Sequence, residues 1–251
     1  MSEAPATVHV LTPTKDRPGR LAEALASLAA QTHGAWRAWV IDDGDGAGLA
    51  AVDAFADPRA QAQANPGRGQ VDARNAALAA ALAGGSPDRD VVMLLDDDDV
   101  LLDADHLAAV TARLARGEAL VHRGGWFEFE TDGRREPFDP PTTAASLRED
   151  NTVLTVGLAW PAALHARLGR FDPAMGSYFD WDWILRVLDA GVPLAHLDGL
   201  GVGYRVHDAN TSARKAGARS DAFARFTAKH GLDVVQKDHV AVHRERRGEG
   251  A

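Results

Sequence analysis

Four consecutive carboxylates have the clearest capacity for chemistry in this chain. Asp96 to Asp99 follow VVMLL (91–95), which reads as a buried strand, and like charges placed side by side at a strand end repel one another. A hard divalent cation, Mg²⁺ or Mn²⁺, bound by carboxylate oxygens is the simplest compensation, and such ions keep positions open for substrate phosphates. The run therefore predicts a metal–diphosphate site. The alternative is a solvated acidic turn that caps the next helix.

A second acidic pair, Asp42 and Asp43, ends the apolar segment WRAWVID (36–42). The loop that follows, GDGAGL, does not have the G-x-G-x-x-G spacing of dinucleotide-binding loops. We interpret Asp42 and Asp43 as acceptors of hydrogen bonds from a base or a ribose. The alternative is a turn in which these side chains bond to their own backbone.

To act together, these acids have to lie on a fold in which several strands end at the same edge of a sheet. The apolar segments 7–11, 36–42 and 90–95 predict strands, and the stretches 18–31, 70–83 and 103–117 predict helices. Apolar strands that alternate with helices indicate an α/β fold with a mainly parallel central sheet flanked by helices. In such sheets ligands bind at the carboxyl ends of the strands, where Asp96 to Asp99 fall.

The pattern changes after about residue 117. A longer strand-like segment (119–130), a polar proline-containing loop (131–150) and a helix around 180–191 follow. We expect a single domain over 1–251, with a nucleotide-binding half at about 7–117, an acceptor and catalytic half at about 118–212, and a tail at about 213–251. The tail is predicted to be partly helical and then disordered towards RERRGEGA.

Composition limits the classes of partner. A formal charge of −9, from 27 basic and 36 acidic residues, argues against nonspecific binding to nucleic acid or to an anionic membrane. The absence of cysteine excludes disulfides, thiolate zinc sites and cysteine nucleophiles. No apolar run approaches the roughly 18 residues of a spanning helix, and the first ten residues lack a signal-peptide pattern. We expect a soluble, cytoplasmic protein and leave peripheral membrane contact open.

Five segments, taken in order over about residues 7–212, resemble the family 2 inverting glycosyltransferases of the GT-A fold. They are VHVLTPTKDRPGRLAEALASLAAQTHGAWRAWVIDDG, NPGRGQVDARN, the Asp-x-Asp-like LLDDDDVLL, GRFDPAM with FDWDWILRV, and YRVHDANTS. Each segment alone is unspecific, whereas their succession in the family's order is specific.

The resemblance implies a role for particular positions of this chain. The residues that it places at the nucleotide-sugar donor, together with the arginines that could neutralise its diphosphate, are Pro13, Thr14, Arg17, Asp42, Asp43, Arg68, Arg74, Asp96 and Asp97. It implies metal ligation by Asp98, with Asp99 supporting it and His207 as a further ligand. Arg205, Arg214 and Lys215 are additional candidates for contacts with the diphosphate.

The resemblance also implies that Asp180 is the catalytic base. A carboxylate can take the proton of an attacking hydroxyl, and Asp180 lies near the start of a predicted helix, on a rigid element. Helix capping is the alternative role, and Asp182 is the second candidate for the base. The chain departs from the family at Phe179, where many relatives have an acid, and at Asp45, where a serine is common.

Four tryptophans belong to the acceptor half. They could stack on sugar rings or pack in the core, and they are Trp126, Trp160, Trp181 and Trp183.

The expected activity is transfer of a sugar, with inversion, from a nucleotide diphosphate donor. We expect a UDP-sugar as donor, Mn²⁺ or Mg²⁺ as cofactor, and the hydroxyl of a glycan, lipid-linked or small-molecule acceptor, in polysaccharide biosynthesis. The alternatives are a nucleotidyltransferase and a catalytically silent protein that binds nucleotide-sugars. The sequence predicts neither the sugar and acceptor nor the oligomeric state.

Overall fold

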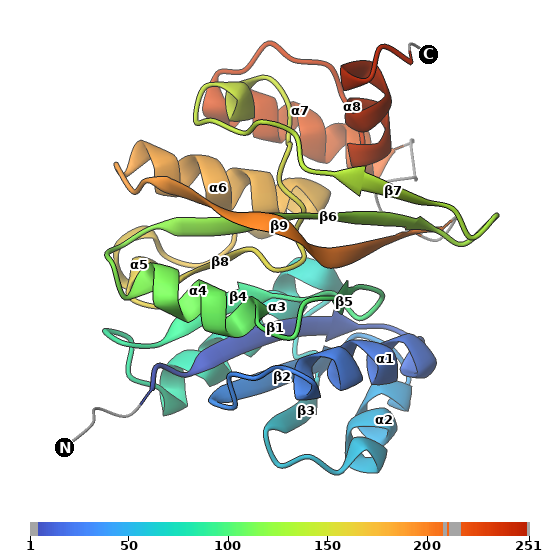
Figure 1. The fold of residues 1–251 in the computed structure, drawn as a ribbon, viewed down its shortest axis with the longest axis vertical. Helices are drawn as coiled ribbons and strands as arrows, with labels where there is room; N and C mark the ends of the chain where they lie inside the picture. Colours follow the sequence, from blue (N-terminus) through green and yellow to red (C-terminus); the bar gives the residue numbers. More distant parts are fainter. Residues whose placement is uncertain (1–4, 208–209, 211–216, 250–251) are drawn as a thin grey trace.

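One nine-stranded sheet runs through the computed structural model, which describes residues 5–207, 210 and 217–249 (Figure 1). The strands are β1 (Val8–Thr14), β2 (Trp36–Asp42), β3 (Ala60–Ala64), β4 (Val91–Leu94), β5 (Val100–Leu101), β6 (Leu120–Phe129), β7 (Arg135–Phe138), β8 (Ala159–Pro161) and β9 (Leu194–Val206). Their order is β3-β2-β1-β4-β8-β6-β9-β5, with β7 paired to β6. The predicted α/β fold is confirmed.

The sheet is parallel in its first half and mixed in its second. β3, β2, β1 and β4 are parallel neighbours. β8 then runs antiparallel to both β4 and β6, whereas β6 and β9 are parallel over most of their length. The strands after residue 117 are therefore joined to the parallel first half of the sheet through one short strand of opposite direction, β8.

Helices cover both faces of the sheet. They are α1 (Pro18–Ala29), α2 (Ala47–Phe55), α3 (Gly69–Gly84), α4 (His106–Leu114), α5 (Leu164–Leu168), α6 (Phe179–Asp189), α7 (Ala218–His230) and α8 (His239–Arg246), with the 3₁₀ helices η1 (Ser146–Arg148) and η2 (Pro173–Tyr178). The helices predicted over 18–31, 70–83, 103–117 and around 180–191 correspond to α1, α3, α4 and α6. Sequence reasoning missed α2, α5, β3, β5 and β8, and the segment 131–150, predicted as a loop, contains β7 and η1.

Strand residues alternate between two hydrophobic cores. Val91 and Met93 of β4 face the core shared with α1 and α4, and Val92 and Leu94 face the core shared with α3 and α6. Successive side chains of a strand point to opposite faces, so a strand covered on both sides has to be apolar throughout. This is why the run that precedes Asp96 contains no polar residue.

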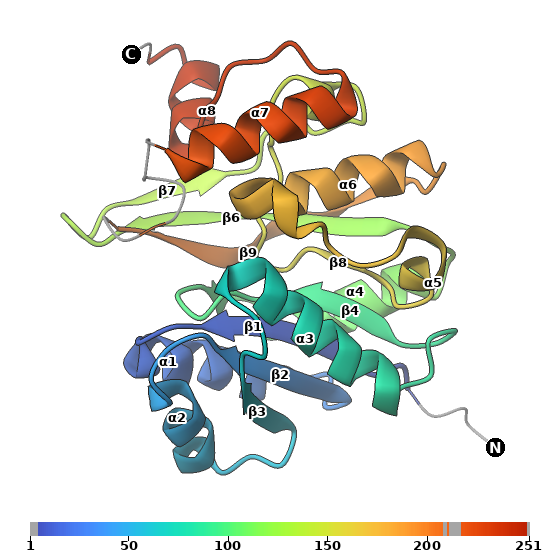
Figure 2. The ribbon, with the colours of Figure 1, turned by 180° about the vertical axis from the view of Figure 1, so that it is seen from behind.

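The tail is more ordered than the sequence predicted. α7 lies beside α6 on the face seen in Figure 2, and α8 follows it. The expectation of disorder near RERRGEGA is wrong for residues 244–249, because α8 extends to Arg246 and the backbone N–H of Glu249 donates to the carbonyl of Arg244.

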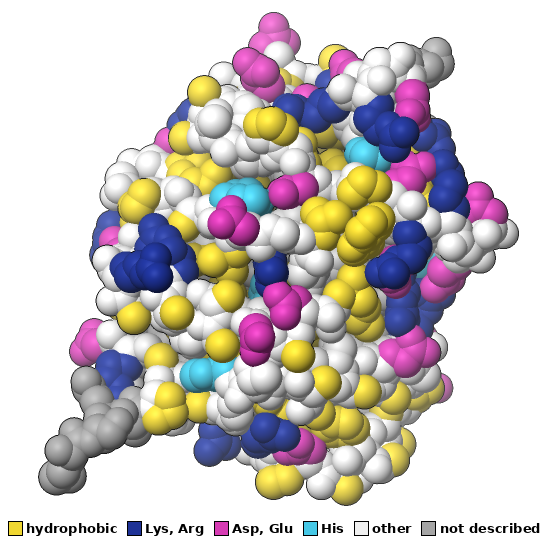
Figure 3. Space-filling model, viewed as in Figure 1, with side chains coloured by type: hydrophobic (Ala, Val, Ile, Leu, Met, Phe, Trp, Pro, Cys, Tyr) yellow, Lys and Arg dark blue, Asp and Glu magenta, His cyan; other side chains and the backbone are white. Residues whose placement is uncertain are grey.

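The surface carries both signs of charge. On the face seen in Figure 3 acidic and basic side chains are interspersed. Within the described residues, no helix has the length and apolar character needed to cross a membrane.

Candidate active site

The four aspartates form a buried turn directly after β4. β1 and β2 run parallel to each other, and β1 runs parallel to β4, so the carboxyl ends of all three strands meet at this edge. One carboxylate oxygen from each of Asp96, Asp98 and Asp99 lies within 4.8 Å of the other two. The neighbouring strands also hold the turn, since Thr14 Oγ1 donates to Asp97 Oδ2 at 2.7 Å and the backbone N–H of Arg205 donates to Asp99 Oδ1 at 3.0 Å.

Two arginines offset part of this negative charge. Arg17, at the start of α1, bonds to Asp98 and places its Nη2 2.8 Å from Asp97 Oδ1. Arg74, on α3, is almost completely buried and bonds to Asp96. Both arginines come from the first half of the chain, so the turn is held mainly by β1, α1, α3 and β4.

The turn still has an excess of negative charge. Burial and repulsion from neighbouring aspartates raise the pKa of Asp99 well above its ordinary range, and burial, despite Arg17, raises the pKa of Asp97 to about 6. Burial also raises the pKa of Asp96, against the opposing effect of Arg74. Burial acts in the same direction on Asp98, but hydrogen bonding from His207 and the charge of Arg17 lower its pKa overall.

This arrangement fits a divalent cation. Three carboxylate oxygens that converge in a buried turn are the donor set that Mg²⁺ and Mn²⁺ prefer, and a bound cation would favour the ionised form of all three. His207 is not part of the group of three. Its Nε2 lies 3.0 Å from Asp98 Oδ2, so the structure places His207 against a candidate ligand.

A cavity of about 680 Å³ connects the two halves of the chain. Its donor end is lined from the loop after β1 and from Asp43, Gly69 and Arg74. All four residues of the acidic turn, Asp96 to Asp99, also line it. The other end, which we call the acceptor end, is lined by Asp150, Asn151, Thr155, residues 177–181 and, from the C-terminal segment, Arg219, Val235, Lys237, Asp238, His239 and Val242.

Asp180 lies at the acceptor end in the first turn of α6. Its Oδ2 accepts a hydrogen bond from Thr155 Oγ1 at 2.7 Å and a longer one from Asn151 Nδ2 at 3.4 Å. Phe179, noted above as a departure from the resemblance, packs under Arg74, whose guanidinium carbon is 4.2 Å from the ring centroid. Polar support for Asp180 therefore comes from a loop distant in sequence, and the residue beside it contributes packing.

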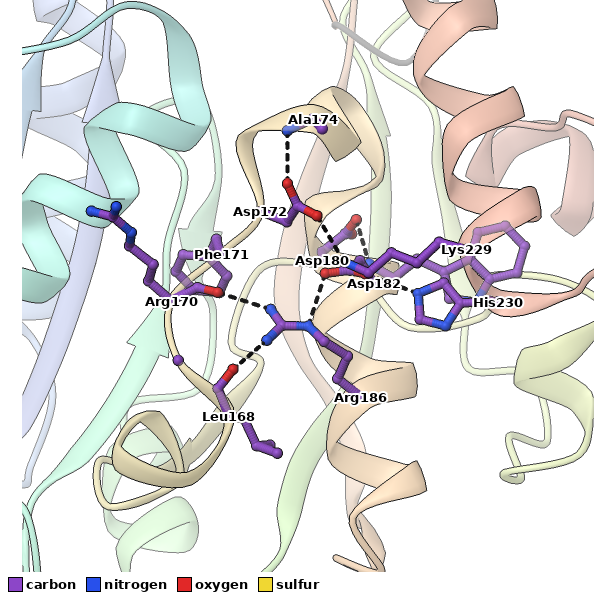
Figure 4. Close-up of polar contacts among 12 residues, drawn as sticks. Leu168, Arg170, Phe171, Asp172, Ala174, Asp180, Asp182, Arg186, Lys229 and His230 are labelled. Atoms are coloured by element: carbon purple, nitrogen blue, oxygen red, sulfur yellow. Dashed lines mark hydrogen bonds and ion pairs between the residues drawn. The ribbon is translucent and has the colours of Figure 1, made fainter.

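Asp182 has a different environment from Asp180. Figure 4 shows its carboxylate surrounded by the cationic or protonatable side chains of Arg186, Lys229 and His230. The three contacts are 2.8–2.9 Å long, and the Asp182 side chain is fully buried. Asp182 does not line the cavity, and its carboxylate joins α6 to α7. The structure therefore gives no support to Asp182 as the second candidate for the base.

Most residues predicted for the donor line the cavity, but two do not. The residues that line it are Pro13, Thr14, Arg17, Asp43, Arg74, Asp96 and Asp97. Asp42 is buried, and its oxygens accept from the N–H groups of Gly44 at 2.7 Å and Gly48 at 2.9 Å. This is the turn bonded to its own backbone that the sequence offered as the alternative to a base or ribose contact. Arg68 is exposed and outside the lining.

The loop glycines beside Asp42 have a packing role. A Cβ atom at Gly48 would lie 2.5 Å from the Thr14 methyl and 3.0 Å from Asp42 Oδ2. Only glycine allows the backbone to approach these side chains so closely. The glycine-rich loop thus seats Asp42 at the end of β2.

Other sequence-based candidates lie elsewhere. The Arg205 side chain pairs with Glu23 outside the cavity lining, and Arg214 and Lys215 fall outside the described residues. Trp160 and Trp183 are fully buried, so they pack in the core and do not stack on a sugar ring. Trp126 is also outside the cavity lining. Of the four tryptophans only Trp181 lines the cavity, and its Nε1 donates to the carbonyl of Leu147 at 2.6 Å.

Sequence reasoning missed most of the acceptor end. Thr155 and Asn151 stand in a loop without a recognisable pattern, so no local signal identifies them. The sequence does contain a signal for the C-terminal helix α7. Phe223 and Phe226 are spaced to lie on one helix face, and Gly231 is a typical residue at a helix end. That pattern is typical of a packed helix and not of a disordered tail.

Comparison with known sequences identifies one family. The sequence model of glycosyl transferase family 2 matches residues 9–166, more than half of the chain. The chain is also 27% identical over 249 residues to the uncharacterized glycosyltransferase YwdF of Bacillus subtilis (strain 168), and the match covers 94% of this chain and 88% of that protein.

Solved structures with a similar fold include two complexes with nucleotide-sugars. S. aureus TarS 1-349 in complex with UDP-GlcNAc superposes with a TM-score of 0.70 at 16% identity, over 92% of this chain and 68% of that one. The mannosyltransferase PcManGT from Pyrobaculum calidifontis, in complex with GDP-Man and Mn²⁺, superposes with a TM-score of 0.66 at 19% identity. That match covers 92% of this chain and 66% of PcManGT. The chain spans 41% of the longer S. aureus TarS structure. At these identities the likeness shows the GT-A fold.

Proposed function

Because the chain belongs to glycosyl transferase family 2 and is a glycosyltransferase, we propose that it transfers a sugar from a nucleotide diphosphate donor to an acceptor hydroxyl, with inversion. The observation that carries the proposal is that one cavity joins the acidic turn Asp96–Asp99 to Asp180. We treat residues 1–251 as one GT-A domain with the donor and acceptor halves described above. Family membership favours this activity over nucleotidyl transfer.

We assign the nucleotide to the donor end. Asp43 lines it, and its Oδ1 is oriented by hydrogen bonds from Asn65 at 2.7 Å and from the N–H of Gly69 at 2.9 Å. Its Oδ2 lies 3.7 Å from Lys15 Nζ, and we assign this oxygen to accept from a base or ribose. UDP is our first choice of nucleotide, and GDP is the second. Two proteins of similar fold are in complex with UDP-GlcNAc and with GDP-Man, which supports UDP and GDP as candidate nucleotides.

We assign a divalent cation, Mn²⁺ or Mg²⁺, to the oxygens of Asp96, Asp98 and Asp99. When bound, such an ion supplies positive charge to the diphosphate as it departs. Arg17 and Arg74 hold the turn in shape, and His207 acts through its contact with Asp98. The role of His207 as a further direct ligand stays a prediction. The Mn²⁺ complex of PcManGT supports a cation at this fold's donor site.

We assign proton transfer to Asp180. A new bond forms between the acceptor oxygen and the anomeric carbon, and the bond from that carbon to the β-phosphate oxygen breaks. The electron pair leaves with the diphosphate, and the hydroxyl proton moves to the carboxylate of Asp180, which Thr155 orients. A single displacement of this kind inverts the anomeric configuration.

Nucleotide binding is the first test. Thermal stability is measured with UDP and with GDP, each with and without Mn²⁺. A ligand at about a hundred times its dissociation constant adds about 2.7 kcal/mol, which is enough to raise the melting temperature by several degrees. Stabilisation by one nucleotide that requires the metal is expected, and no stabilisation by either would remove the basis of the proposal.

Catalysis is tested separately on the Asp180→Asn variant. It should keep nucleotide affinity and lose both sugar transfer and slow donor hydrolysis, because asparagine cannot accept the proton. A wild-type protein that binds nucleotide but neither transfers nor hydrolyses the donor would instead be a binding protein. Nuclear magnetic resonance of the product reports its anomeric configuration.

A further inference from the structure

The C-terminal segment beyond the family match builds part of the acceptor end. The family match ends at residue 166, whereas Arg219 of α7, the segment 235–238 and His239 of α8 all line the cavity. Because these residues line the acceptor end, their chemistry bears on which acceptor is recognised.

Arg219 differs from the other cationic residues of the cavity. Lys237 Nζ is 3.0 Å from Asp150 and 2.6 Å from Glu245, and Arg17 and Arg74 pair with the acidic turn. Lys15 Nζ lies 3.7 Å from Asp43. Across the described residues Arg219 makes no ion pair: its Nη2 donates to the carbonyl of Lys237 at 3.1 Å, and its Nε is buried without a hydrogen-bond partner.

Arg219 is held close to the catalytic helix. Its guanidinium carbon lies 5.5 Å from the ring centroid of Tyr178, the residue that precedes α6. The same ring stacks on Phe226 of α7, and its hydroxyl accepts from Gln236 at 2.7 Å. Arg219 therefore lies on the wall that leads to Asp180, at the acceptor end.

The attachment of α7 keeps Arg219 in place. Lys229 bridges Asp172 and Asp182, and His230 bonds to the same oxygen of Asp182 (Figure 4). These contacts fix the far end of α7 on α6, so that the guanidinium of Arg219 extends from a rigid element.

We propose that Arg219 binds an anionic group of the acceptor, a phosphate or a carboxylate, beside the hydroxyl that Asp180 deprotonates. The planar guanidinium matches such groups with two parallel hydrogen bonds. A half-buried cation that makes no ion pair with the described residues gains most from such an anion. The donor diphosphate is a poorer match, because its proposed binding site is at the acidic turn with Arg17 and Arg74. This inference rests on the proposed function and narrows its acceptor to hydroxyl compounds that carry an anion.

The experiment compares two probes that differ only by a phosphate. Glycerol and glycerol 3-phosphate are titrated by calorimetry into protein saturated with UDP and Mn²⁺, so that the donor end is occupied. Wild-type protein should bind glycerol 3-phosphate and not glycerol. Arg219→Gln should weaken the phosphate-dependent binding at least about tenfold, as expected for loss of a charge-assisted pair. Arg225→Gln is the matched control, since it removes an exposed guanidinium of the same helix outside the cavity.

Three outcomes overturn the inference. They are wild-type protein that does not prefer glycerol 3-phosphate, an Arg219→Gln variant that binds it as tightly as wild type, and an equal loss in Arg225→Gln. An Arg17→Gln variant locates the anion: loss there with retention in Arg219→Gln would place it at the donor end and also refute the inference. Nucleotide binding measured on the same samples separates these results from failure of the proposed function.

Discussion

The Nε2 atom of His207 lies 3.0 Å from Oδ2 of Asp98, and this contact joins the end of β9 to the turn after β4. Arg17 bonds to the same oxygen from the start of α1. The carboxylate of Asp98, which we assign to a divalent cation, is thus oriented by one residue far before it and one far after it in the sequence. Contacts of this kind commonly set the geometry and the affinity of a metal site.

Replacement of His207 should therefore affect the metal more than the nucleotide. We expect His207→Ala to weaken Mn²⁺ binding about 10- to 100-fold, which is the usual cost of losing a partner of a metal ligand. Asp98→Asn should remove metal-dependent nucleotide binding entirely. Calorimetric titration of Mn²⁺ in the presence of UDP measures both. If His207→Ala binds Mn²⁺ as wild type does, the contact has no role at the site.

The hydroxyl of Thr155 should be required for catalysis and not for donor binding. Thr155→Val keeps the side-chain shape but removes the 2.7 Å hydrogen bond to Asp180. Loss of a hydrogen bond to a charged group costs about 1.5–3 kcal/mol, so the transfer rate should fall at least about tenfold. Thr142→Val is the control, because its hydroxyl bonds to Thr152 and Pro140 away from the cavity lining. Equal rates in the two variants would refute the assignment.

Asp182 should stabilise the fold through its buried contacts. Asp182→Asn leaves Arg186 and Lys229 without their shared charge, and breaking a buried ion pair typically costs about 3–5 kcal/mol. Asp172→Asn is the matched control, since Asp172 also pairs with Lys229 but is about a third exposed, and such pairs contribute about 1 kcal/mol or less. Urea unfolding of both variants gives the comparison. Similar losses would show that burial of Asp182 carries no extra stability.

Stability should fall in mild acid because of buried neutral histidines. His165 accepts from Trp160 Nε1 at 3.0 Å and donates from Nδ1 to the carbonyl of Gly169 at 2.8 Å, so both ring nitrogens are satisfied only in the neutral form. Burial lowers the pKa of His165 from 6.5 to about 4. The unfolded chain therefore takes up a proton as the pH falls through about 6.5 and the folded protein does not, so this stabilisation is full above that pH and is lost towards pH 4.

The His165→Gln variant measures this contribution. Between about pH 6 and pH 4.5 the free energy of unfolding of wild type should fall more steeply than that of the variant, by up to about 1.4 kcal/mol per pH unit. Denaturant unfolding at a series of pH values gives both slopes. Parallel slopes would mean that His165 is protonated equally in the folded and unfolded states.

The sequence determined the parts of this protein that depend on local pattern. Apolar strands such as 91–95 identify the sheet, because a strand covered on both faces has no polar position. Asp96 to Asp99 were placed at its binding edge because parallel strands end together. The order of the family segments identified the family, and the family match confirms it.

Tertiary structure decided which side chains meet. Thr155 reaches Asp180, His207 reaches Asp98, and Arg219 reaches the wall before α6, in each case across at least 25 residues of chain. No sequence periodicity predicts these contacts, because they depend on the antiparallel placement of β8 between β4 and β6 and on the packing of α7 against α6. The same packing gives two aspartates of one helix turn different roles: Asp180 faces a cavity, and Asp182, two residues later and rotated about the helix axis, faces the cations of α6 and α7.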